Sequence, residues 1–342
     1  MAIPDLLDEA YEQLHTKGPE FEGWLSNHGP MAVDALIRLG RGDDVSGWVS
    51  RYVRRLEPMP DTRWPIAEAD WAGLLGEASR LGDWCALLTR QVRDEPWEAV
   101  LARWWPRLVP GAVASAAHGL IRTGHAVRAL REKVTEPRLV ELGHALGYWA
   151  ARWQPLPRPG GTRGSADVGV ALDSLPARQL TGGIRGRLAS LDKDSTWSSA
   201  LAIVPPVADP PAVPAALDAL VDAAVTHYGR WGQAAPVMLV HSATAPRAVA
   251  LVLPALPEQL WPEAYEAAWA VSATIATIYR PSPPTVVADE RPSTIDEVIE
   301  RASTSGDEHA IKFTEVATES HRRNNATALT SAARAVALIG AE

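Results

Sequence analysis

Cysteine is almost absent from this chain of 342 residues, which contains only Cys85. A lone cysteine excludes an internal disulfide and any metal site built from several thiolates. Runs of eighteen or more apolar residues are absent as well, so we expect no helix that crosses a membrane. The first residues, MAIPDLLDEAYEQLH, lack the basic start and the apolar stretch of a signal peptide, which predicts a cytoplasmic protein.

Positive charge and phenylalanine are also scarce. The formal net charge of −8 argues against nucleic acid as a partner, because phosphate binding needs concentrated Lys and Arg. The chain has 2 Phe but 14 Trp. Tryptophan combines a large packing area with an N–H donor, which suits a pocket for a flat polycyclic ligand. A genome that encodes Trp where others use Phe would explain the same composition, so both interpretations stay open.

Strand signals, such as alternating β-branched residues with Asn-Gly turns, are few, and the helical period dominates. We therefore predict an all-α protein, either a large helical bundle or a solenoid-like array of helices. The predicted helices span residues 3–15, 31–39, 65–81, 82–93, 97–105, 111–130, 138–153, 213–228, 237–253, 261–279, 293–302, 307–321 and 326–339. We expect one domain over residues 1–342, with helical halves 1–154 and 211–342.

The segment that joins the two halves, residues 155–210, is irregular. It begins with PLPRPGGTRG, and VPPVADPPAVP, residues 204–214, marks its end; proline at this density is incompatible with a helix interior. The piece between them could be a linker or a lid over a pocket, with glycines that supply hinge freedom.

Histidines carry the strongest chemical signal. In HGLIRTGHAVRAL, His118 and His125 are seven residues apart, so both project from nearly the same helix face, with Arg122 between them. A polar stripe on an apolar helix is costly to bury without partners. A metal ion, an anionic substrate held by Arg122, or a hydrogen-bonded core network would each satisfy it.

Three further histidines have suggestive settings. His28 precedes a Gly-Pro helix start, His241 lies in an apolar helix interrupted by Pro246, and His309 lies one turn before Lys312. Neutral imidazole suits first-row transition ions, and a cysteine-free site near Glu315 favours iron over structural zinc. The ammonium of Lys312 has no lone pair, so Lys312 can bind a metal only as the neutral amine or as a carbamate. The remaining histidines, His15, His144, His227 and His321, are interpreted as structural or exposed.

Four motifs together resemble the questin oxidase-like family in content, order and spacing. They are NHGPMAVDALIRLG, HGLIRTGHAVRAL, HSATAPRA and DEHAIKFTE, and YWAARWQPLP fits the same pattern. The match runs from about Leu6 to the C-terminus, and HGLIRTGHAVRAL is its most specific part.

The resemblance implies an oxygenase that cleaves rings of anthraquinone-like polyketides, or inserts oxygen into them, in a Baeyer–Villiger-type step. It implies an aromatic polyketide and O2 as substrates and NADPH as a candidate electron donor, and it is compatible with Fe(II) as the metal. Carried over by motif, the predicted metal ligands are His28, His118 or His125, His241, His309 and Lys312. Arg122 would hold a phenolate or carbonyl oxygen of the substrate, and Lys312 would also take part in catalysis.

Flavin is not expected, because the glycine runs GGTRG and GGIRG match no dinucleotide-binding motif between a strand and a helix. Two other functions stay open. A zinc hydrolase could use the same histidines to activate water. A helical binding protein without activity would pack them in its core. Neither the oligomeric state nor the particular substrate follows from the sequence.

Overall fold

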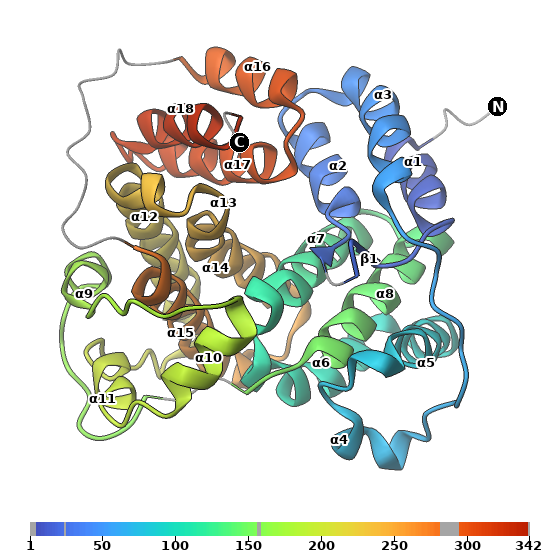
Figure 1. Ribbon diagram of the computed structural model, residues 1–342, viewed down its shortest axis with the longest axis horizontal. Helices are drawn as coiled ribbons and strands as arrows, with labels where there is room; N and C mark the ends of the chain where they lie inside the picture. The colour runs from blue at the N-terminus through green and yellow to red at the C-terminus, as the bar shows by residue number, and fades with distance from the viewer. Residues whose placement is uncertain (1–4, 24, 156–158, 281–293, 341–342) are drawn as a thin grey trace. The chain divides into compact units, whose positions relative to one another are not determined.

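The computed structural model describes residues 5–23, 25–155, 159–280 and 294–340. Helices make up nearly all the regular structure in these ranges, which confirms the predicted all-α class (Figure 1). The strands described there form one antiparallel hairpin, β1 (Glu20–Phe21) with β2 (Leu25–Ser26). The chain divides into two compact units, and each is described by itself. The first unit is Met1–Pro155 with Leu251–Pro257, and the second is Leu156–Ala250 with Glu258–Glu342.

The first unit is built around α8, which packs against α5 and α7 (Figure 1). Its α-helices are α1 (Leu6–His15), α2 (Gly29–Arg38), α3 (Gly42–Tyr52), α4 (Trp71–Leu74), α5 (Leu81–Asp94), α6 (Trp97–Leu108), α7 (His118–Glu132) and α8 (Glu136–Arg152). Its 3-10 turns are η1 (Val53–Arg55), η2 (Glu68–Asp70), η3 (Ala78–Arg80), η4 (Val109–Gly111), η5 (Ala114–Ala117) and η8 (Leu253–Ala255).

Two glycines let α8 approach α5 closely. A Cβ atom on Gly143 would lie 2.5 Å from the Cα of Thr89, and one on Gly147 would lie 2.8 Å from the Cα of Cys85. Both neighbours are backbone atoms of α5, which cannot rotate away as a side chain can. Because Gly143 and Gly147 have no Cβ atom, α8 can lie this close to α5.

We expect Gly147→Ala to destabilise the protein by about 1–3 kcal/mol, because an added methyl group must push α8 away from α5. Gly47→Ala is the matched control. A Cβ there would meet only the tip of Arg51, at 3.5 Å, and alanine raises helix propensity by about 1 kcal/mol. Urea unfolding of both variants measures the difference. Equal stabilities would show that α5 and α8 can separate at little cost.

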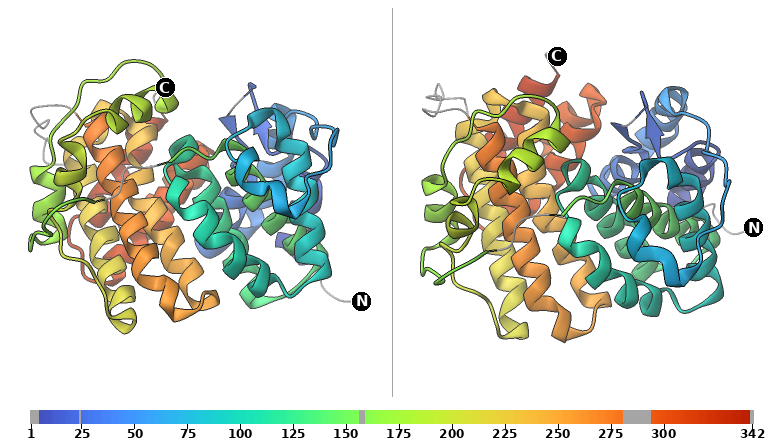
Figure 2. Two further views of the ribbon diagram at one scale, coloured as in Figure 1. Left: turned by 90° about the horizontal axis from the view of Figure 1, so that it is seen from below. Right: turned by 60° about the horizontal axis from the view of Figure 1, so that its bottom comes forward.

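The second unit is a helical bundle in which the long helices α12 and α15 run side by side (Figure 2). Its α-helices are α9 (Val168–Ser174), α10 (Ile184–Asp192), α11 (Trp197–Leu201), α12 (Val213–Trp231), α13 (Pro236–Leu239), most of α14 (His241–Val252), α15 (Trp261–Tyr279), α16 (Ile295–Ser305), α17 (Glu308–Arg322) and α18 (Ala328–Ile339). Its 3-10 turns are η6 (Pro210–Ala212), η7 (Gly232–Ala234) and η9 (Glu258–Leu260).

The middle segment, which was predicted to be irregular, contains α9, α10 and α11, and residues 159–210 belong to the second unit. Trp269 of α15 donates its indole N–H to the carbonyl of Leu201, at 2.9 Å. Arg187 of α10 donates to the carbonyl of Ile278 at the end of α15, at 2.8 Å. These contacts tie the segment to a long helix of its own unit.

Three predicted helices differ from the structure: the helix predicted at 111–130 starts only at His118, the one at 237–253 is divided into α13 and α14, and the one at 65–81 does not form. Residues 65–81 form only short turns, η2, α4 and η3, because the chain reverses at Gly76 with a positive φ of 80°. A Cβ on Gly76 would also lie 2.5 Å from the carbonyl oxygen of Trp153. The helical period of this stretch is real, but the left-handed glycine stops the helix. Two predicted helix starts, residues 3–4 and 293, lie outside the described residues.

Tryptophan serves mainly to fill the core. Six tryptophans are among the largest fully buried side chains, namely Trp84, Trp104, Trp105, Trp149, Trp197 and Trp269. Several pack edge to face, as Trp84 does on Trp104 with ring centroids 5.7 Å apart. This burial favours the compositional explanation of the Trp content over a tryptophan-lined pocket.

Among the described residues, one helical stretch, Pro236–Ala255, is long and apolar enough to cross a membrane by length and composition. Its apolar window is 72% buried inside the structure, as in the core helix of a soluble protein. The predicted cytoplasmic location stays a prediction.

Candidate metal centre

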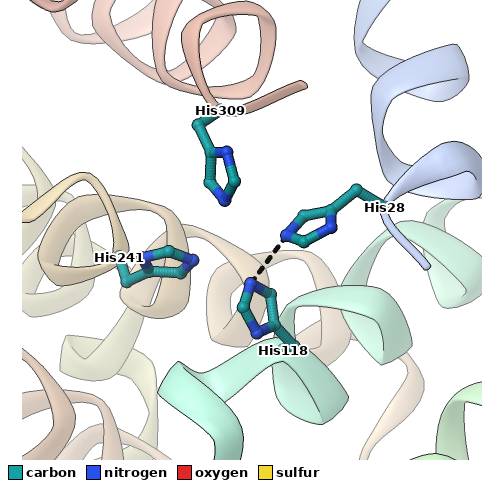
Figure 3. Close-up of side chains that lie close together, drawn as sticks. All are labelled: His28, His118, His241 and His309. Atoms are coloured by element: carbon teal, nitrogen blue, oxygen red, sulfur yellow. Dashed lines mark hydrogen bonds between the residues drawn. The ribbon is translucent and has the colours of Figure 1, made fainter. Parts of the chain in front are cut away.

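Four of the predicted histidine ligands, His28, His118, His241 and His309, are buried, and imidazole is a side chain that can bind a metal ion. His28 and His118 belong to the first unit, and His241 and His309 to the second. Figure 3 shows these four side chains.

The pair in the first unit is directly hydrogen-bonded. The Nε2 atoms of His28 and His118 lie 2.8 Å apart, and the two rings meet edge to face (Figure 3). His28 caps the start of α2, where Pro30 occupies a position in the first turn as the sequence indicated. The backbone N–H of His28 donates to the hydroxyl of Tyr52 at 2.7 Å, which holds the residue at this helix start.

A left-handed turn of the backbone directly precedes His118. The three residues before it, Ser115, Ala116 and Ala117, all have positive φ angles, between 49° and 63°. This left-handed region costs a residue with a side chain about 1–2 kcal/mol. Such strain persists where the surrounding structure holds it, and it clusters at functional sites.

The strained turn has a chemical consequence for His118. It places the carbonyl oxygen of Ser115 2.5 Å from Nδ1 of His118. A carbonyl only accepts hydrogen bonds, so Nδ1 carries the proton and donates it. Nε2 of His118 then keeps its lone pair and accepts the hydrogen bond from His28. Metal-binding histidines commonly show this arrangement, with the second nitrogen donating to a backbone carbonyl or a carboxylate.

We expect Ala116→Gly to stabilise the protein by about 1 kcal/mol, because glycine adopts a positive φ without steric cost. Ala126→Gly is the control, since this residue lies inside the right-handed helix α7, where glycine costs about 1 kcal/mol. Thermal unfolding of the two variants should shift in opposite directions. A lower stability of Ala116→Gly would mean that the left-handed turn carries no strain.

The second unit presents its two histidines in the same manner. Nδ1 of His241 lies 3.1 Å from the carbonyl oxygen of Met238, and Nδ1 of His309 lies 3.5 Å from a carboxylate oxygen of Asp307. Their ring centroids are 5.4 Å apart (Figure 3). Burial lowers the pKa of His241 well below its usual value, with His309 and Lys312 acting in the same direction. His241 is therefore neutral at physiological pH, as a metal ligand must be.

Pro246 lies inside α14 as predicted, and its effect is visible one turn earlier. A proline inside a helix cannot donate to the carbonyl four residues before it, which here belongs to Ser242. The hydroxyl of Ser272 on α15 donates to that carbonyl instead, at 2.7 Å. The proline thus connects the helix that begins with His241 to α15.

Lys312 lies one turn after His309 on α17 and is 1% exposed. Its Nζ atom has no hydrogen-bond partner among the described residues. Burial lowers the pKa of Lys312 to about 8, although the nearby carboxylates of Glu308 and Asp307 oppose the shift. With this pKa, a minority of the molecules carry Lys312 as the neutral amine at physiological pH.

The structure does not bring His125 to the position of His118. Its Nδ1 lies 2.8 Å from a carboxylate oxygen of Asp34, which also accepts hydrogen bonds from Arg128. Burial alone would raise the pKa of Asp34, but Arg128 and the hydrogen bond with His125 lower it. Of the two alternatives on α7, His118 lies beside His28, and His125 belongs to a buried ion-pair network.

Arg122 is paired inside the protein. Its guanidinium donates two hydrogen bonds to the carboxylate of Glu141, one of them from Nη2 at 2.7 Å, and the side chain is 1% exposed. Nη1 has no hydrogen-bond partner among the described residues. The predicted role of Arg122 in holding a substrate oxygen stays a prediction. Its partner Glu141 lies 19 residues away on another helix, so no local sequence signal indicates the pair.

Three of the four histidines interpreted as structural or exposed are packed in the interior. His15 and His144 lie beside Glu141 in the first unit. His227 stacks on Trp231 in the second unit, with ring centroids 5.5 Å apart. The ELGH sequence, which places Glu141 and His144 one helical turn apart, was the available signal for the first group.

Burial and the nearby Arg280 lower the pKa of His227 to about 3. Between about pH 6.5 and pH 3 the unfolded chain therefore binds a proton that the folded protein does not. The free energy of unfolding should fall as the pH drops through this window. His227→Phe, which preserves the stack on Trp231, should lose stability less steeply between pH 7 and pH 4. Parallel urea-unfolding profiles for wild type and variant would contradict this expectation.

No protein-family model matches the chain, and no curated protein matches it. The resemblance to the questin oxidase-like family therefore stays a prediction from the four motifs.

Proposed function

We propose that this protein is a metal-dependent oxygenase, and that His28, His118, His241 and His309 together hold its metal ion. One observation carries the proposal. In His118, His241 and His309, Nδ1 faces an oxygen atom from the residues just before it, which leaves Nε2 as the donor for a metal. The proposal requires the histidines of the two units to face a common ion.

The donor set favours a first-row transition ion. Four imidazole nitrogens suit iron, zinc, copper or nickel, whereas magnesium and calcium prefer oxygen ligands. Each pair alone is too small, since even an open zinc site takes three protein ligands. Fe(II) is the ion we propose, because the family resemblance implies dioxygen chemistry and the chain shows no flavin motif. Bound iron would supply the redox chemistry that activates dioxygen.

Lys312 would extend this ligand set. The neutral amine has a lone pair with which it can bind a metal ion. Its reaction with CO2 would release a proton and give a carbamate, which binds through oxygen. Its burial and its unpartnered Nζ support either form. NMR of protein prepared with 13C-bicarbonate distinguishes them, since only the carbamate gives a labelled carbonyl signal that Lys312→Gln loses.

The proposed substrate is an anthraquinone-like aromatic polyketide, bound as a phenolate or hydroquinone. The reaction would be oxidative ring cleavage or a Baeyer–Villiger-type insertion next to a carbonyl. Arg122 would position a substrate oxygen through Nη1 while Glu141 holds the rest of its guanidinium. NADPH is a candidate source of electrons if only one oxygen atom enters the product.

Metal analysis of protein purified without added metal or chelator is the first test. We expect iron bound in the wild type, and loss of that iron in both His118→Ala and His241→Ala, one variant for each unit. Oxygen uptake with an anthraquinone-type hydroquinone should then require iron. Zinc that supports hydrolysis but no oxygen uptake would replace the oxygenase with a hydrolase. Failure to bind any metal after anaerobic reconstitution with Fe(II) would overturn the proposal.

A further inference from the structure

A second set of metal-ligating side chains lies wholly within the first unit. His15 is the last residue of α1, and Glu141 and His144 lie one turn apart on α8. Nε2 of His15 is 2.9 Å from Oε2 of Glu141, and the rings of His15 and His144 meet edge to face with centroids 5.0 Å apart. One ligand atom from each residue lies within 4.8 Å of the others.

Arg122 orients the carboxylate from the other side. Its hydrogen bonds reach both oxygens of Glu141, and metal-binding carboxylates are commonly held by such outer partners. Its charge opposes a cation, but a carboxylate has about four lone-pair sites, so oxygen atoms that accept from Arg122 can still bind an ion. The His15 side chain is 11% exposed, so solvent reaches one member of the set.

We propose that His15, Glu141 and His144 form a second metal site, which takes zinc or another first-row divalent ion. Two histidines with one carboxylate form a donor set typical of zinc and non-haem iron sites. An ion there would link the end of α1 to α8 and so hold these two helices of the first unit together. The inference does not depend on the four-histidine centre or on the proposed oxygenase activity.

Titration of the chelator-treated, full-length protein with Zn(II) and Co(II) tests the proposal. Co(II) reports its coordination through visible d–d absorption. We expect His15→Gln and His144→Gln each to bind one ion fewer per chain than the wild type, or to bind it at least about tenfold more weakly. His15→Gln is the safer variant, because glutamine can still donate to Glu141 from a partly exposed position.

A full-length His28→Ala/His118→Ala variant separates this site from the four-histidine centre. It should still bind Co(II), and adding His15→Gln should abolish that signal. The circular dichroism of each variant checks that its helices are intact. Unchanged ion numbers and affinities in His15→Gln and His144→Gln would overturn the second site. A wild-type protein that binds no iron and takes up no oxygen, but still gives the Co(II) signal that His15→Gln loses, would count against the oxygenase alone.

Discussion

His118→Ala is expected to weaken iron binding by more than about 100-fold. Removing an outer hydrogen-bond partner of a metal ligand already costs 10–100-fold in affinity, and removing the ligand itself should cost more. His118 is the strongest choice because its tautomer is defined by the carbonyl of Ser115 and its Nε2 lies 2.8 Å from that of His28. Titration of the chelator-treated protein with Fe(II) under anaerobic conditions measures the effect.

His125→Ala is the matched control for this experiment. The residue lies on the same helix, two turns away, but its ring bonds to Asp34. We expect this variant to keep its iron affinity while losing stability, because Asp34 loses one of its buried partners. If instead His125→Ala lost iron and His118→Ala kept it, the assignment on α7 would be reversed.

Arg122→Met is expected to destabilise the protein by about 3–5 kcal/mol. Methionine fills much of the same space, but the carboxylate of Glu141 is then left buried without its main counter-charge. Adding Glu141→Gln should recover part of the loss, since the buried charge is then removed as well. Urea unfolding in the presence of a chelator measures this without interference from bound ions.

Arg103→Met provides the contrast for Arg122. Arg103 makes a similar paired contact with Glu95, at 2.8 Å for both bonds, but this pair is partly exposed to solvent. Its loss should cost no more than about 1 kcal/mol. If Arg122→Met were as stable as Arg103→Met but lost oxygenase turnover, Arg122 would act on the substrate and contribute little to the fold.

Most helices could be predicted from the sequence because their signals are local. The predicted helix at 261–279 is α15 itself, and the one at 307–321 differs from α17 by one residue at each end. The start of α17 follows from Asp307, whose side chain accepts from the backbone N–H groups of His309 and Ala310. The stretch 65–81 failed because Gly76 reverses the chain to meet Trp153, and residues so far apart in sequence leave no local signal.

The residue types and spacings alone determined the all-α class and the histidines suited to a metal. They did so because periodicity, helix capping and proline act within one or two turns. The tertiary structure decided which of these side chains meet. His118, not His125, is hydrogen-bonded to His28. Arg122 donates to Glu141, and His15 is hydrogen-bonded to the same residue of α8. These partners are 19 to 126 residues apart, so only the packing of helices can bring them together.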